Sequence, residues 1–229
     1  MYITEIFNSI QGEGTRAGLP CIFVRLTGCN LRCSWCDTAY AFYGGKKMSV
    51  GEVFARVDEL CGSKSKDNGP REKLVELTGG EPLLQEEIYP LADQLLTAGY
   101  TLMIETSGER FIGRLPKEVI KIVDVKCPDS GEPNTFDERN LNELDSKDEV
   151  KFVISTRRDY EFARAFTAEH NLSRRVNEIL FSPVHDDPQG NWKGLDAGKL
   201  VEWILEDKLP VRLGLQLHKI VWDPATKGV

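Results

Sequence analysis

The sequence predicts an α/β protein built on a parallel sheet, and three observations indicate this fold class. Short apolar runs alternate with segments of helical periodicity, which implies parallel strands joined by right-handed crossovers. Polar motifs follow the ends of most of these runs. The 229 residues suit a single domain over 1–229 but fall short of the about 250 that a full (β/α)8 barrel needs. A partial barrel or an open doubly wound sheet remains.

The strands are predicted from apolar runs, each bounded by polar or turn-forming residues. Arg25 interrupts the second run, so we expect it to pair with a structural carboxylate or with an anionic ligand. The predicted strands cover residues 2–7, 21–26, 74–77, 101–104, 119–125, 150–154, 178–181 and 211–217.

The helices are predicted from apolar side chains that recur on one face. Ser49 and Glu52 form a capping box before the first helix, and Gly99 ends a second one over 86–98. Two more are expected around 160–166 and 200–205. Residues 62–70 should form a polar surface loop, and residues 129–149 a solvated connection rather than an excursion over a site.

Motifs able to do chemistry follow the ends of the predicted strands. The carboxyl ends of parallel strands share one edge of the sheet, which is where α/β folds place their active sites. We therefore expect one reaction chamber at that edge. The motifs are the cysteine loop 29–38, TGGEP (78–82), ETSG (105–108), DVKCP (124–128), SPVHD (182–186) and LHK (217–219).

Composition excludes several classes of function. The net charge of −7 argues against nucleic acid as a partner, because phosphate binding usually needs a basic surface. No apolar run approaches the about 18 residues of a membrane span, and the N-terminus lacks the features of a signal peptide. We expect a cytoplasmic enzyme without a membrane partner. Its six cysteines should then be thiols or metal ligands.

Cys29, Cys33 and Cys36 carry the most specific signal, a C-x3-C-x2-C spacing. A structural zinc site normally has four ligands, and an ordinary cubane iron–sulfur cluster takes four thiolates. A cluster held by only three cysteines leaves one iron free to bind another ligand. The count therefore predicts chemistry at the cluster beyond electron storage.

This loop, followed by a strand that ends in Gly-Gly-Glu-Pro, resembles that of the radical S-adenosylmethionine (SAM) superfamily. The resemblance implies a partial (β/α)6-type TIM barrel with a [4Fe-4S] cluster on Cys29, Cys33 and Cys36. SAM would chelate the open iron, and one electron would cleave it to methionine and a 5′-deoxyadenosyl radical. The glycine pair Gly79-Gly80 would let the backbone approach the methionine of SAM.

Four further motifs resemble the 7-carboxy-7-deazaguanine synthase (QueE) family: residues 10–14 (IQGEG), Arg25, residues 36–38 (CDT) and His218-Lys219. The resemblance implies a lyase that converts 6-carboxy-5,6,7,8-tetrahydropterin to 7-carboxy-7-deazaguanine with loss of ammonia. This product leads to queuosine and other deazapurines. The family also implies Mg²⁺, a homodimer and a reducing partner such as a flavodoxin.

The roles of individual residues follow from the same resemblance. No catalytic side chain is expected, because the SAM-derived radical abstracts the hydrogen. Thr38 would place its hydroxyl on Mg²⁺, a hard cation suited to oxygen ligands. The pterin contacts would be Ile10, Gln11, Gly12, Glu13, Arg25, Thr78 and Pro224. The SAM contacts would be Trp35, Cys36, Asp37, Gly80, Glu105, Lys126, Cys127, Pro128, Ser182, Pro183, Val184 and His185.

Two features differ from some members of the family. This chain keeps the short spacing between its first two cluster cysteines, where some members insert residues. Some members end near the equivalent of Pro224 and use the terminus at the substrate, whereas this chain continues to Val229. The role of Pro224 is therefore open.

Two rival functions share part of the pattern. A radical SAM activase, which generates a glycyl radical on a partner enzyme, would have the same cluster loop, but the QGEG turn and the CDT ending argue against it. A zinc-binding or electron-transfer module is the non-enzymatic rival. Three clustered cysteines without a fourth ligand fit zinc poorly.

Overall fold

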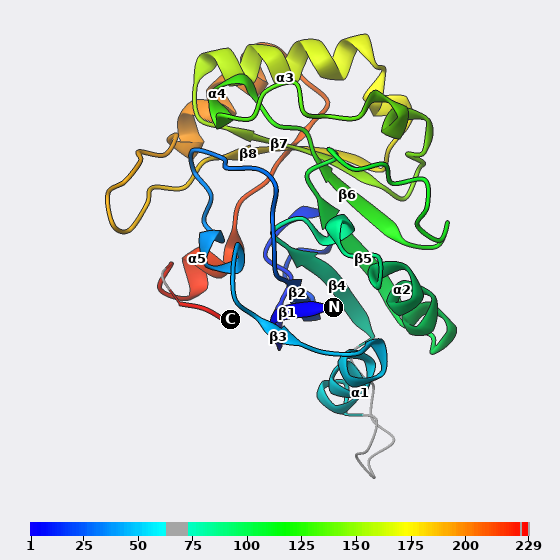
Figure 1. The fold of residues 1–229 in the computed structure, drawn as a ribbon. Helices are drawn as coiled ribbons and strands as arrows, with labels where there is room; N and C mark the ends of the chain where they lie inside the picture. The colour runs from blue at the N-terminus through cyan, green and yellow to red at the C-terminus, as the bar shows by residue number, and fades with distance from the viewer. Residues whose placement is uncertain (63–72, 225, 229) are drawn as a thin grey trace.

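The computed structural model in Figure 1 describes residues 1–62, 73–224 and 226–228. Its strands form one nine-stranded sheet in the order β3-β1-β2-β4-β5-β6-β7-β8-β9. The strands are β1 (Tyr2–Ile10), β2 (Pro20–Leu26), β3 (Lys46–Lys47), β4 (Leu74–Gly79), β5 (Thr101–Thr106), β6 (Ile120–Asp124), β7 (Glu149–Ile154), β8 (Glu178–Pro183) and β9 (Arg212–Leu213). The α-helices are α1 (Val50–Leu60), α2 (Ile88–Thr97), α3 (Arg157–Glu169), α4 (Ala197–Glu206) and α5 (Leu217–Val221).

The sheet is parallel from β2 to β9, and the predicted partial barrel is confirmed. Only β1 and β3 run antiparallel to their neighbours. Figure 1 shows the sheet curving, with α1, α2, α3 and α4 on its outer side. In the described chain, the connections from β5 to β6 and from β6 to β7 contain no α-helix, and the second carries two short 3₁₀ helices, Pro128–Ser130 and Glu138–Asn142.

Alternation along the strands separates two faces of the sheet. The outer face carries the large apolar core, which includes Val24, Leu77, Ile104 and Phe152 and packs against the helices. The inner face is apolar only towards the amino ends of the parallel strands, where a small cluster fills the barrel. Its members are Cys21, Phe23, Leu74, Met103, Ile120 and Ile122, with Phe7 packed against them.

The inner face becomes polar towards the carboxyl ends of the strands. Arg25 pairs with Thr78 in the register of β2 and β4, and Asp124 pairs with Lys151 in that of β6 and β7. Several of these polar side chains are buried. The fold therefore encloses a polar chamber above an apolar floor.

Two predictions of local structure are wrong. The strand expected over 211–217 covers only Arg212–Leu213, because Gly214 lies against Ser182 and Leu217 donates its backbone N–H to Gly12 O at 2.9 Å, which starts α5. The connection 129–149 is not simply solvated, since Asn140 is fully buried and bonds to Gly108 O and Arg110 O. The polar loop predicted over 62–70 lies outside the described residues from 63 onwards.

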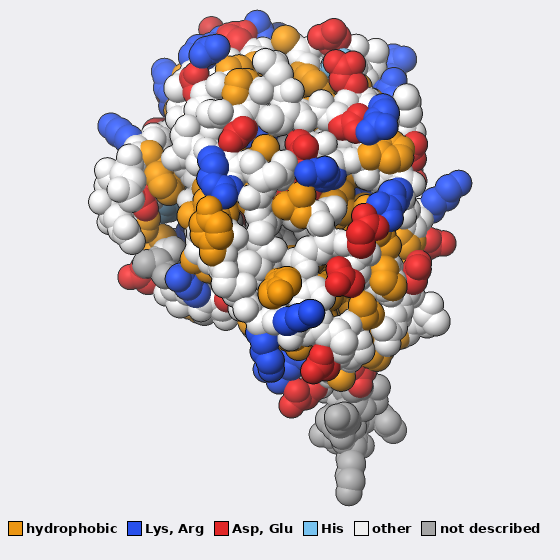
Figure 2. All heavy atoms as spheres, in the orientation of Figure 1, with side chains coloured by type: hydrophobic (Ala, Val, Ile, Leu, Met, Phe, Trp, Pro, Cys, Tyr) orange, Lys and Arg blue, Asp and Glu red, His pale blue; other side chains and the backbone are white. Residues whose placement is uncertain are grey.

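The described helices include no membrane span, and the face drawn in Figure 2 carries charges of both signs. No helix among the described residues is long and apolar enough to cross a membrane. On the face drawn in Figure 2, Lys and Arg side chains are interspersed with Asp and Glu.

Candidate active site

The three cluster cysteines lie in the loop that leaves β2 at the carboxyl edge of the sheet. All three are partly exposed free thiols. Burial raises the pKa of Cys29, and it raises the pKa of Cys33 to about 11, with the charges of the other cysteines contributing in the same direction. Burial therefore disfavours the thiolate forms of Cys29 and Cys33, and a bound cation would favour them.

This donor set fits an iron–sulfur cluster. Among the described residues, no three His, Cys, Asp or Glu side chains converge on a point where one metal ion could sit. A cubane cluster does not need such convergence, because each thiolate binds a different iron. Three thiols on one loop match that requirement.

The Gly79-Gly80 turn packs directly against the cysteine loop. A Cβ on Gly80 would lie 2.3 Å from Gly28 O and 2.7 Å from the Cβ of Cys29. Gly79 has φ of +152°, and its Cβ would lie 2.4 Å from Leu26 O. The glycines thus allow two loops to meet, and the SAM contact of Gly80 stays a prediction.

Glu81, which the sequence analysis did not assign, ties two loops of the site together. Its fully buried carboxylate accepts hydrogen bonds from Thr106 Oγ1 at 2.8 Å and from both the N–H and the hydroxyl of Ser107. It also accepts from Leu83 N. The turn after β4 is therefore fixed to the turn after β5.

Lys151 forms the centre of the chamber and was also missed. Its Nζ lies 2.5 Å from Glu13 Oε2 and 2.8 Å from Glu105 Oε1. The turn that carries Glu13 leaves β1 at the amino edge of the parallel strands, since Ile10 pairs with Pro20. The side chain of Glu13 nevertheless reaches Lys151 in the middle of β7. The only sequence signal for Lys151 was a lysine at an inward position of an apolar strand.

Gln11 and Glu76 form a buried pair beside this centre. The Gln11 amide donates to the Glu76 carboxylate, while Gln11 Oε1 accepts the backbone N–H of Glu13 at 3.1 Å. Burial, together with the charges of Glu105 and Glu13, holds the pKa of Glu76 well above its usual value. The side chain of Gln11 is therefore engaged within the protein, and burial favours the neutral form of the Glu76 carboxyl group.

Arg25 has the structural carboxylate partner that was one of its two predicted alternatives. Its Nε donates to Glu5 Oε1 at 2.7 Å, and the hydroxyl of Tyr40 donates to the same oxygen at 2.8 Å. Pro224 is exposed. After it, the chain comes back to Tyr40, and Lys227 Nζ lies 4.3 Å from the centre of the Tyr40 ring.

The helix α5 connects the cluster loop with the turn after β1. Lys219 Nζ lies 2.6 Å from Asp37 Oδ2, and Gln216 Nε2 donates to Glu13 Oε1 at 2.9 Å. Burial works against ionisation of Asp37, but Lys219 lowers the pKa of this carboxyl to about 2. Thr38 follows directly, with its hydroxyl 3.8 Å from Cys36 Sγ.

Two buried oxygens of the chamber have no hydrogen-bond partner in the described chain, namely Ser182 Oγ and Asp124 Oδ1. The other Asp124 oxygen accepts from Lys126 Nζ at 2.7 Å. Unpaired buried oxygens are costly, so they suit a site that a polar ligand completes. Ser182 and Lys126 are among the expected SAM contacts.

Four residues assigned to SAM have contacts of their own, and their roles towards SAM stay predictions. His185 is exposed and bonds to Asp186 O, and Val184 is buried with its N–H on Ile154 O. Cys127 is buried against the outer core, and Pro128 begins a 3₁₀ helix. Among the other predicted residues, the structure joins Glu13 to Asp37 through Gln216 and to Glu105 through Lys151.

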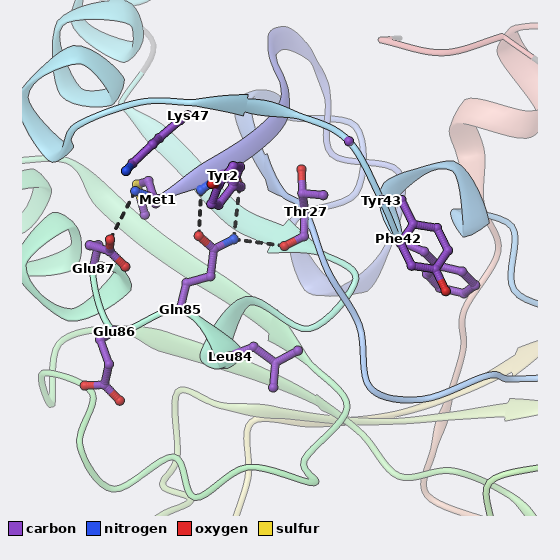
Figure 3. Close-up of a pocket in the computed structure, with 11 residues that line it drawn as sticks. Met1, Tyr2, Thr27, Phe42, Tyr43, Lys47, Leu84, Gln85, Glu86 and Glu87 are labelled. Atoms are coloured by element: carbon purple, nitrogen blue, oxygen red, sulfur yellow. Dashed lines mark hydrogen bonds and ion pairs between the residues drawn. The ribbon is translucent and has the colours of Figure 1, made fainter.

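A cavity of about 590 Å³ lies beside the cysteine loop rather than in the chamber. Figure 3 shows Gln85 within it, bonded to the backbone of Tyr2 and to Thr27 O. None of the predicted site residues lines this cavity. The ion pairs of Lys151 with Glu13 and Glu105 lie in the chamber itself.

Comparisons with known proteins find relatives along the whole chain. A model of the radical SAM superfamily matches residues 23–126. The chain is 53% identical to 7-carboxy-7-deazaguanine synthase of Koribacter versatilis, covering 100% of both chains. It is 42% identical to the synthase of Methanospirillum hungatei, covering 98% of this chain and 86% of the relative.

Solved structures of related proteins share the fold of this chain. QueE from Escherichia coli superimposes with a TM-score of 0.70 at 26% identity, covering 95% of this chain and 94% of QueE. A radical SAM methyltransferase from Sphaerobacter thermophilus shares the fold alone, with a TM-score of 0.59 at 16% identity, covering 85% of this chain and 66% of that one. Nothing in these relatives supports the activase alternative. This chain belongs to the 7-carboxy-7-deazaguanine synthase family of radical SAM enzymes.

Proposed function

We propose that this chain is a radical SAM carbon–nitrogen lyase that converts 6-carboxy-5,6,7,8-tetrahydropterin to 7-carboxy-7-deazaguanine with loss of ammonia. The observation that carries this proposal is the 53% identity to a 7-carboxy-7-deazaguanine synthase over the full length of both chains. The three thiols of the cysteine loop and the polar chamber beside them support it.

The chemistry divides between cofactors and protein. When bound, the cluster and SAM supply a 5′-deoxyadenosyl radical that takes a hydrogen atom from the substrate. Cys29, Cys33 and Cys36 would hold the cluster, and the unpaired oxygens of Ser182 and Asp124 would accept hydrogen bonds from SAM. Around the substrate, Glu13 accepts N–H donors and Arg25 offers positive charge to a carboxylate.

A magnesium site at Thr38 is part of the proposal. A hydroxyl oxygen suits this hard cation, and Thr38 lies two residues after the last cluster cysteine, where substrate oxygens could complete the coordination. Bound there, the ion would supply a second positive charge for the substrate carboxylate.

The expected setting of the enzyme also belongs to the proposal. We expect a single domain, a homodimer, a cytoplasmic location and a reducing partner such as a flavodoxin. Supporting the first of these, every described strand belongs to one sheet.

The reaction can be tested with reconstituted protein, SAM, dithionite and the carboxytetrahydropterin, with and without Mg²⁺. We expect the absorbance of a deazaguanine to appear, and more of it with Mg²⁺. If no deazaguanine forms in either condition while SAM is still cleaved, the proposed substrate is wrong. If the protein contains zinc in place of iron and sulfide, radical chemistry is excluded altogether.

A further inference from the structure

Lys151 is a buried cation that no assigned role explains. It lies on the inner face of β7, and only 6% of its surface is exposed. Burying an ammonium group costs several kcal/mol unless it is paired and hydrogen-bonded. Neighbouring groups therefore have to offset the free-energy cost of burying the charge of Lys151.

Those neighbours are two carboxylates from distant parts of the chain. Glu13 comes from the turn after β1 and Glu105 from β5, and Lys151 binds both, at 2.5 Å and 2.8 Å. An ammonium group has three N–H donors, so it can serve both carboxylates at once. Lys151 thus connects the side of the chamber proposed for the pterin with the side proposed for SAM.

Of the two carboxylates, Glu13 is the one whose ionisation depends on the positive charge of Lys151. Burial alone would raise the pKa of Glu13, but Lys151, helped by Gln216, lowers it. Glu76 and Glu105 also face this centre, and the pKa of each is raised mainly by burial. Without Lys151, three carboxyl groups would share one buried space, and Glu13 would lose its main reason to stay ionised.

We propose that Lys151 is a positioning residue that keeps the Glu13 carboxylate ionised and directed at the pterin. Each Glu13 oxygen already accepts one donor, from Lys151 or from Gln216, and each retains capacity for another. The ring N–H and amino donors of a pterin match that capacity. This inference rests on the proposed function, because it requires a pterin in the chamber.

Lys121 provides a matched control. It lies on the neighbouring strand β6, is equally buried and forms an ion pair with Asp148 at 2.8 Å. Its side chain belongs to the outer side of the sheet, since it pairs in register with the outward Ile104. Lys121→Met therefore removes a buried lysine without touching the chamber.

The experiment measures the binding of 6-carboxypterin, an oxidised and unreactive analogue, to the cluster-loaded protein by fluorescence titration. We expect Lys151→Met to weaken binding at least about 10-fold, which is about 1.4 kcal/mol. Lys151→Arg should restore most of the loss, and Lys121→Met should bind within about twofold of wild type while unfolding at lower temperature.

A double-variant cycle keeps the test decisive even if Lys151→Met folds poorly. If Lys151 acts through Glu13, adding Lys151→Arg or Lys151→Met to Glu13→Gln should weaken binding little further. Binding by Lys151→Met equal to wild type, or effects that multiply in the double variant, would overturn the inference alone. Failure of wild type to bind 6-carboxypterin would overturn the proposed substrate and this inference with it.

Discussion

Glu81 fixes the cluster side of the chamber because a single buried carboxylate accepts four hydrogen bonds. Glu81→Ala would leave the donors of Leu83, Thr106 and Ser107 buried and unpaired. We expect a loss of about 3 kcal/mol in the free energy of unfolding, measured by urea denaturation.

The control for this change is Glu86→Ala. Glu86 bonds to Arg114 on the surface, with 72% of its side chain exposed, so its loss should leave the free energy of unfolding close to that of wild type. Equal losses for the two variants would contradict the role given to Glu81.

Cys33 tests the cluster directly. Cys33→Ala removes one of three thiols that have no substitute in the loop, so bound iron and sulfide should fall to background and turnover should be lost. Cys61→Ala is the control, because that thiol is buried in the outer core beyond α1. Retention of a full complement of iron by Cys33→Ala would contradict the assignment.

Thr38 tests the proposed magnesium site. Thr38→Ala should still cleave SAM, because its hydroxyl holds no cluster iron, but it should lose most of the stimulation by Mg²⁺. The measurement is product formation against Mg²⁺ concentration in both proteins. An unchanged metal response would remove Thr38 from the site.

At the residue scale, the cluster cysteines were predictable from their spacing along the chain. Contacts between side chains on different strands were not predictable. The C-x3-C-x2-C pattern is local, and so is the CDT ending. The bonds of Lys151 to Glu13 and Glu105 span strands far apart in sequence. The apolar run around Arg25 predicted that this side chain needs a partner, but only the fold shows that the partner is Glu5.

Among the elements, the turn after β4 holds the cysteine loop in place. Gly80→Ala would push a Cβ into Gly28 O and Cys29, so we expect less iron per chain after reconstitution. Gly51→Ala is the matched control, because a Cβ there meets nothing within 4 Å and alanine favours helix α1. Normal iron content in Gly80→Ala would contradict this packing.

The helix α5 should be held to the cluster loop in a pH-dependent way. The pKa of Asp37 falls to about 2 on folding, so its contribution is present above the unfolded pKa of about 3.9 and is lost as pH falls towards about 2. With 43% of the Asp37 side chain exposed, Lys219→Met should cost less than about 1 kcal/mol near neutral pH.

The measurement is the difference in unfolding temperature between wild type and Lys219→Met. It should be about 2 °C near pH 7 and shrink below about pH 4. A difference that stays constant down to about pH 3 would show that Lys219 acts through something other than its pair with Asp37.

This helix also shows why one element could not be predicted. The apolar run over 211–217 has the composition of a strand, but its ladder ends at Leu213. Contacts of Leu217 with Gly12 and of Lys219 with Asp37 then redirect the chain. Both partners lie near the other end of the sequence, and periodicity carries no information about them.

For the whole molecule, the parallel sheet was predictable because its strands and helices alternate with clear periods. The shared edge of the strands followed from the same pattern, and the cysteine loop and the turns after β4, β5 and β6 do meet there. The origin of Glu13 at the opposite edge was not predictable, since it depends on β1 running antiparallel.

We expect the cluster and the chamber to work together in one ring-contracting reaction. The most direct measurement is the ammonia released per deazaguanine formed by reconstituted protein with SAM, dithionite, Mg²⁺ and the carboxytetrahydropterin. We predict about one ammonia per deazaguanine, and neither product from Cys33→Ala. Cleavage of SAM by the wild-type protein without ammonia or deazaguanine would contradict the claim.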